Sequence, residues 1–270
     1  MTSRRISNIL TKEWRVMLYD LNSLLFVTLL PLLIIGQALL LIWLIERFGG
    51  DAVLTNTMFQ IAVEKMAEAL PAVARLAIGE QLQVFLLNQI NFYLLLIPIM
   101  IAISFATFSI VDEKLSGSLE ALLATPIRTW ELLMGKALAG AVPALLVTWV
   151  CAVLFILGVI GLGWGHLVNL VLTPSWFISL FLLTPAVALL SFMLGVIGSS
   201  RAKDAKSAQN IVVVIILPVM VLIGLQVTGS IWFTPLLNLS LALGIAILDY
   251  FILRIAVRLF QRESIVVKWH

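Results

Sequence analysis

The chain has 270 residues, of which 62% are apolar and only 11% are charged. A soluble domain is about 45–50% apolar and about 25% charged, so this composition excludes a disordered chain, a nucleic-acid-binding domain and an ordinary soluble enzyme. The formal net charge of +3 is small, and its distribution along the chain is more informative than its size.

The first 21 residues predict an amphipathic helix that lies in the inner membrane interface. Apolar residues recur at helical spacing, whereas Arg5, Lys12, Arg15 and Asp20 lie off this stripe. The pattern leaves one alternative open, a plain extension of the first membrane helix into the cytosol. The apolar stripe consists of Ile6, Ile9, Leu10, Trp14, Met17, Leu18 and Leu21.

Six apolar runs follow, and each is about as long as the roughly 20 residues that a helix needs to cross a bilayer. Lipid offers the backbone no hydrogen-bond partner, so each run is expected to be helical. We therefore expect an all-α membrane protein in which residues 1–270 form a single transmembrane domain. The runs lie at 24–45, 92–111, 137–162, 176–197, 211–227 and 236–257.

The distribution of Lys and Arg predicts the orientation. With the N-terminus inside, only Arg47, Lys65 and Arg75 of the 17 basic residues lie on the outer side. The positive-inside rule then places both termini in the cytoplasm. The inner 14 are Arg4, Arg5, Lys12, Arg15, Lys114, Arg128, Lys136, Arg201, Lys203, Lys206, Arg254, Arg258, Arg262 and Lys268.

The longest outer segment, residues 46–91, contains apolar positions that fit two short helices separated at Pro71. Such a segment can form a structural cap, a lid over an exit or a docking site for an outer partner. The apolar positions are Met58, Ile61, Ala62, Met66 and Ala69 before the proline, and Val73, Leu76, Ala77, Val84 and Leu87 after it.

The polar residues argue against a membrane enzyme. His166 lies in an outer loop and His270 ends the chain, so neither can activate a buried nucleophile. Asp249 is the one carboxylate well inside a run, and we expect it to pair with an interfacial Arg or Lys; a coupling site for an ion is the alternative. Gly135-Lys136 does not complete a phosphate loop, because Trp130 and Ala137 stand where Gly and Ser or Thr are required.

The inner segment 112–136 predicts two capped helices between the second and third runs. Ser116 or Ser118 can cap a short helix that Pro126 ends. Thr129 can cap a second helix, with Glu131 in its first turn, that leads into the third run. A solvated loop is the alternative, but a bare loop does not need two capped helices. Leucines form the stripe of the short helix: Leu119, Leu122 and Leu123.

This segment resembles the type-two family of ATP-binding-cassette permeases, of the exporter kind. The family pattern is acidic-basic-x-x-Gly-Thr-Leu-Glu-x-Leu-Leu-x-Thr-Pro, followed by Glu-x-x-x-Gly-Lys, and Ser118 replaces the usual Thr. The matching residues are Glu113, Lys114, Gly117, Leu119, Glu120, Leu122, Leu123, Thr125, Pro126, Glu131, Gly135 and Lys136.

The resemblance implies that this segment is a coupling helix that receives force from a separate ATPase. A basic loop that is similar to the family's second inner loop would make a smaller contact with the ATPase through Arg201, Lys203, Lys206 and Gln209. The implied assembly holds two ATPase subunits, which bind ATP and Mg, and a second permease, identical or related. This chain itself would bind no cofactor, metal or nucleic acid and would lie in the cytoplasmic membrane. A self-sufficient ion-coupled carrier or channel and a non-transporting scaffold or assembly factor are the alternatives.

Overall fold

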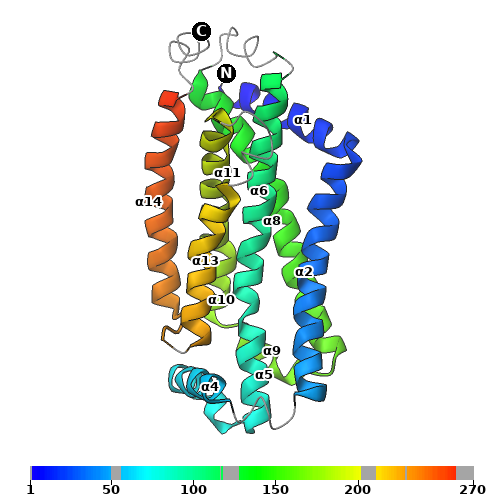
Figure 1. Ribbon diagram of the computed structural model, residues 1–270, viewed down its shortest axis with the longest axis vertical. Coiled ribbons are helices and arrows are strands. Elements are labelled where there is room, and N and C mark those ends of the chain that lie inside the picture. Colours follow the sequence, from blue (N-terminus) through cyan, green and yellow to red (C-terminus); the bar gives the residue numbers. More distant parts are fainter. Residues whose placement is uncertain are drawn as a thin grey trace.

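The structure is a computed structural model that describes residues 2–49, 56–115, 117, 128–201, 211–228 and 230–259. Within these residues all regular secondary structure is helical, and most helices run along one axis (Figure 1). The α-helices are α1 Thr2–Tyr19, α2 Leu21–Phe48, α4 Thr57–Ala69, α5 Ile78–Asn88, α6 Ile90–Leu115, α8 Thr129–Gly161, α9 Val168–Val171, α10 Pro174–Ile178, α11 Thr184–Arg201, α13 Ile211–Val227 and α14 Pro235–Leu259. The short turns are η1 Val73–Arg75, η2 Gly165–Leu167 and η3 Ser179–Leu183.

Five helical stretches of the described residues are long and apolar enough to cross a membrane, by length and composition. The run predicted at 211–227 forms α13, whose 17 residues lie at the short limit of roughly 17–25 residues for a spanning helix. The multi-pass architecture is therefore confirmed, while a sixth span at α13 stays a prediction. The five stretches are Leu24–Phe48, Ile78–Ser109, Thr129–Gly161, Pro174–Ser199 and Pro235–Arg258.

Residues 46–91 contain the two expected helices, but the second half of this segment belongs to the core. α4 and α5 flank the Pro71 turn as predicted. α5 leads at Gln89 into α6, and the two together form the stretch Ile78–Ser109. Phe85 and Leu87 of α5 are fully buried, so the second membrane stretch begins well before residue 92. The boundary that we predicted was wrong because we treated these buried apolar residues as part of a surface segment.

The fourth predicted run contains a wide helical turn that the sequence did not indicate. η3 is a π-helix between α10 and α11. The Thr184 hydroxyl donates to the carbonyl oxygen of Ser179, five residues earlier, at 2.8 Å. A π turn carries one more residue than an α turn, so it changes which helix faces meet the neighbours before and after it.

Two ends of the bundle matter for function. α1 lies across one end, beside the last turns of α6 and the first turns of α8, and this is called the α1 end (Figure 1). α4 lies at the opposite end, called the α4 end (Figure 1). Between them, α6 and α11 approach closely: a Cβ on Gly195 of α11 would lie 2.9 Å from the Cβ of Ala106 on α6. Ala106 is fully buried, so this contact lies inside the helix bundle.

Candidate functional site

At the α1 end, α1 packs directly on α8. A Cβ on Gly135 would lie 3.1 Å from Cγ2 of Ile9, so the glycine lets the two helices approach. The indole Nε1 of Trp14 donates to the carbonyl oxygen of Ala139 at 3.0 Å. Ile9 is buried, as its place on the predicted apolar stripe requires. α1 is therefore attached to the beginning of α8 by both apolar and polar contacts.

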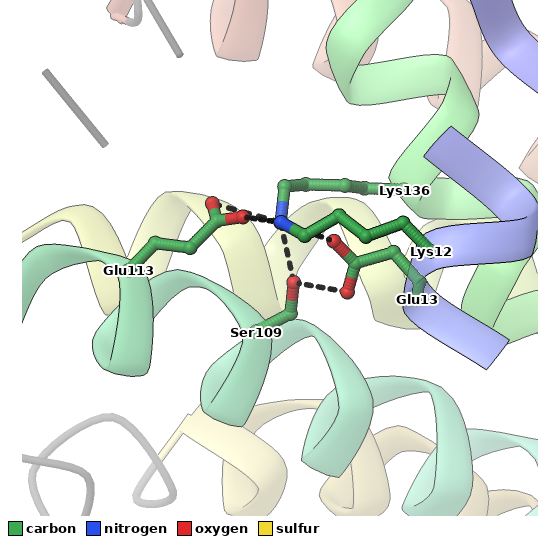
Figure 2. A network of polar contacts seen from close by, with 5 residues as sticks. All are labelled: Lys12, Glu13, Ser109, Glu113 and Lys136. Atoms are coloured by element: carbon green, nitrogen blue, oxygen red, sulfur yellow. Dashed lines mark hydrogen bonds and ion pairs between the residues drawn. The ribbon is translucent and has the colours of Figure 1, made fainter. Parts of the chain in front are cut away.

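Five polar side chains meet where α1, α6 and α8 come together (Figure 2). Lys136 of α8 is at the centre of this polar network: its Nζ lies 3.1 Å from Oε1 of Glu13 and 2.9 Å from Oε2 of Glu113. The same Nζ also donates to the Oγ of Ser109. The polar network consists of Lys12 and Glu13 of α1, Ser109 and Glu113 of α6, and Lys136 of α8.

The remaining contacts of the polar network join α1 to α6 directly. The Ser109 hydroxyl donates to Oε2 of Glu13 at 3.0 Å. The Nζ of Lys12 lies 2.9 Å from Oε1 of Glu113 and 3.5 Å from Oε1 of Glu13. Two cations thus face two carboxylates, so the charges balance.

Burial makes these contacts energetically important. The side chain of Lys136 is 1% exposed, that of Glu13 is 7% exposed and that of Glu113 is 9% exposed. A buried charge is costly unless it is paired and hydrogen-bonded, and losing one partner of a buried pair typically costs about 3–5 kcal/mol. The arrangement therefore fixes α1, α6 and α8 relative to one another.

Lys12 differs from the other charged members because its side chain is half exposed. Burial by itself lowers the pKa of Lys12, but the hydrogen bond and negative charge of Glu113, together with Glu13, outweigh it. The pKa of Lys12 is therefore raised above its ordinary value of 10.5. Lys12 stays charged throughout the physiological range and closes the polar network on its solvent side.

The structure describes five of the twelve predicted coupling residues. Glu113 and Lys136 pair with each other, and Glu131 and Gly135 are buried on the first turns of α8. Gly117 is exposed and has φ +70°, a conformation that favours glycine. The others lie outside the described residues: Ser118, Leu119, Glu120, Leu122, Leu123, Thr125 and Pro126.

The predicted cap of α8 was wrong by one residue. Arg128 occupies the N-cap position, and Thr129 is the first helical residue. The Glu131 carboxylate accepts a hydrogen bond from the backbone N–H of Arg128 at 3.1 Å, which satisfies one of the free donors at the helix start. The predicted second helix does lead into the third run, because Thr129–Gly161 is one continuous helix.

The predicted second inner contact is described at one residue only. Arg201 is the last residue of α11. Lys203, Lys206 and Gln209 lie outside the described residues.

The sequence analysis did not identify Glu13 or Ser109 as members of the polar network. It named Lys12 but did not predict its ion pairs. Glu13 did leave a signal, because it follows Ile9 by four residues and so lies on the face that packs on the bundle. A carboxylate on such a face needs a buried cation. Lys136 at the start of the third run was the available partner.

Asp249 makes no ion pair with the basic residues that the structure describes, where we expected one at the interface. Among the described residues it has no ion pair, and its Oδ1 is buried without a hydrogen-bond partner. Arg254, the nearest basic residue on α14, lies over the Tyr250 ring instead, 4.6 Å from its centre. Residues four apart meet on one helix face, which favours Tyr250 over Asp249 as the neighbour of Arg254. The described residues also contain no cluster of three or more His, Cys, Asp or Glu side chains that could hold a metal ion.

Comparison with known proteins identifies the chain. Its sequence matches the family model of the ABC-2 family transporter protein over residues 7–257, from α1 to α14. The chain belongs to the ABC-2 transporter family. It is therefore a multi-pass membrane protein and the membrane component of an ABC transporter, as the resemblance of the inner segment implied. No curated protein and no solved structure matched the chain in the same comparison.

Proposed function

We propose that this ABC-2 protein is the permease subunit of an ATP-driven exporter and forms half of its translocation pathway. A second permease, identical or related, supplies the other half. Two ATPase subunits bind ATP and Mg on the cytoplasmic side, where both termini lie. α13 is the sixth span, and the complex works in the cytoplasmic membrane.

The observation that carries this proposal is the position of the polar network at both ends of the inner segment. Glu113 lies in the last turn of α6, where the chain enters this segment, and Lys136 lies in the first turns of α8, where the chain leaves it. Force applied to the segment by an ATPase would pass into α6, α8 and α1 together. Because Glu113 and Lys136 are buried, we assign them to positioning the coupling segment, and we assign contact with the ATPase to residues between Gly117 and Pro126.

Within the coupling segment, Glu120 and Leu122 are the residues to alter first. The second inner loop, with Arg201, Lys203, Lys206 and Gln209, makes a smaller contact with the same ATPase. In this proposal the permease carries no nucleotide site of its own, and ATP reaches the transporter only through the partner.

The test uses the permease purified with its ATPase in lipid nanodiscs. An ATPase should co-purify, and ATP should change amide hydrogen exchange at the α4 end in the wild type. Glu120→Ala and Leu122→Ala should keep ATP hydrolysis but lose this change. Leu157→Ala is the control, because Leu157 is exposed and lies outside both the inner segment and α4. An unchanged exchange response in the Glu120 and Leu122 variants contradicts the coupling assignment.

Asp249 favours the second candidate function, an ion-coupled carrier without an ATPase. Asp249 lies on α14, and its Oδ1 is buried and makes no hydrogen bond with the described residues. This function requires solute flux through the lone permease in vesicles without nucleotide, and loss of that flux in Asp249→Asn. Absence of flux from the lone chain eliminates this candidate and leaves the exporter.

A further inference from the structure

A small cavity with a mixed polar and apolar wall lies at the α4 end, away from the polar network. Its volume is about 120 Å³, and it lies between the end of α4, the junction of α5 and α6, the start of α10 and the connection from α13 to α14. No charged residue lines it, and Trp232 and Phe233 supply its aromatic wall. The polar residues that line it are Asn88, Asn91, Thr173, Ser175, Gln226 and Thr234.

Gln226 is the residue that points to a ligand. It is 4% exposed, lines the cavity and makes no hydrogen bond with any residue of the described ranges. A carboxamide offers two donors and one acceptor, and leaving them unsatisfied in a buried place costs about 1–3 kcal/mol. Buried polar groups in proteins nearly always have a partner, so the Gln226 amide calls for one inside the cavity.

The neighbouring side chains leave acceptors available beside Gln226. The Asn88 amide nitrogen donates to the carbonyl oxygen of Val84 at 2.9 Å, and that of Asn91 donates to the carbonyl oxygen of Asn88 at 3.3 Å. Neither side-chain oxygen makes a hydrogen bond with the described residues. Ser175, in contrast, is occupied: its hydroxyl donates to the carbonyl oxygen of Phe233 at 2.6 Å. The cavity thus presents donors from Gln226 and acceptors from Asn88 and Asn91.

We propose that this cavity binds an uncharged, hydroxyl-rich group, namely one edge of a sugar ring. A hydroxyl both donates and accepts, which matches a wall of carboxamides and hydroxyls. A charged group would be buried without a counter-ion and is disfavoured. The volume is slightly below the roughly 150 Å³ that holds a six-membered ring, so a group of about six heavy atoms fits. The carbon face of such a group would pack on Trp232.

Two sources can supply this chemistry, a glycolipid headgroup and a free sugar. The experiment uses the full chain in nanodiscs without an ATPase, so its result does not depend on the proposed exporter function. Native mass spectrometry measures retention of monoglucosyldiacylglycerol against diacylglycerol with the same acyl chains. Saturation-transfer NMR measures binding of free methyl glucoside.

Gln226→Leu should reduce binding about tenfold, because one buried hydrogen-bonding group is lost. The variant should melt at or above the wild-type temperature, since an unpaired amide is replaced by an apolar group of similar size. Gln37→Leu is the matched control, because Gln37 is exposed on α2. If the wild type retains the glycolipid preferentially and Gln226→Leu abolishes this preference, the source is a lipid. If only methyl glucoside binds, and Gln226→Leu abolishes that binding, the source is a free sugar. Binding of neither probe, or equal binding by Gln226→Leu, overturns the proposal and leaves a cavity that holds water.

Discussion

The Nζ of Lys136 lies 2.9 Å from Oε2 of Glu113, although these residues stand at opposite ends of the inner segment. Both side chains are almost fully buried, and Glu13 of α1 lies 3.1 Å from the same nitrogen. The segment therefore leaves and enters the bundle at two points that one lysine holds together. α1 completes this arrangement, because it supplies the second carboxylate.

Removing Lys136 should destabilise the protein more than removing Glu13. Lys136→Met leaves the two buried carboxylates with only the half-exposed Lys12 as a cation, with an expected cost of about 3–5 kcal/mol. Glu13→Gln leaves Lys136 paired with Glu113 and should cost about 1–3 kcal/mol. Unfolding in detergent measures both. Lys65→Met is the control, because the Lys65–Glu68 pair is exposed and should contribute less than about 1 kcal/mol. Equal losses for the two buried variants would contradict the central position of Lys136.

The contribution of Lys12 should disappear at high pH. Its folded-state pKa is raised above 10.5 by Glu113 and Glu13, so the stability it adds is fully present below pH 10.5 and is lost as pH rises through the raised value. The difference in melting temperature between wild type and Lys12→Met should therefore shrink above pH 10.5. Lys12→Arg should keep its stability in that range, because the guanidinium stays charged. A difference that is constant with pH rules out an electrostatic role.

Gly195→Ala should destabilise the contact between α6 and α11. The new methyl group would lie 2.9 Å from the Cβ of Ala106 and 3.4 Å from the backbone of Ile103, neither of which can rotate away. Overpacking of this kind costs about 1–3 kcal/mol. Gly244→Ala is the control, since a Cβ there meets nothing within 4 Å and alanine favours helix. Thermal unfolding of both variants checks the prediction, and equal melting temperatures would refute it.

Asn238→Leu should loosen α14. The Asn238 amide nitrogen donates to the carbonyl oxygen and to the Oγ of Ser175, at 3.0 and 2.8 Å. Only 11% of the most apolar stretch of α14 is buried, so these hydrogen bonds supplement its packing on α10 and α11. We expect a loss of about 1–3 kcal/mol and faster hydrogen exchange along α14. Ser240→Ala, on the exposed face of the same helix, should change neither quantity. Faster exchange in both variants would indicate a general effect on the helix.

The sequence predicted the elements well and the contacts between them poorly. Apolar length identified the long helices, and the motif identified Glu113 and Lys136. It did not identify Glu13 as their partner, because that contact depends on how α1 is positioned along α8, which no local pattern records. The pairing expected for Asp249 is not found among the described residues for a similar reason: basic residues lie near it in the sequence, but Arg254 stacks on Tyr250 instead.

The sequence did not indicate the π turn at η3, because Ser179–Leu183 has the composition of an ordinary apolar helix. It has a consequence for insertions and deletions in this gene. An α-helix advances by about 100° per residue, so deleting one residue from the regular part of α11 before Gly195 would rotate Gly195 by that angle relative to α10. Deleting one residue from η3 would instead convert the wide turn into a regular turn, so Ser175 would still meet Asn238 while Gly195 still faced Ala106. The wide turn is therefore the place in this span where the loss of one residue should do least harm.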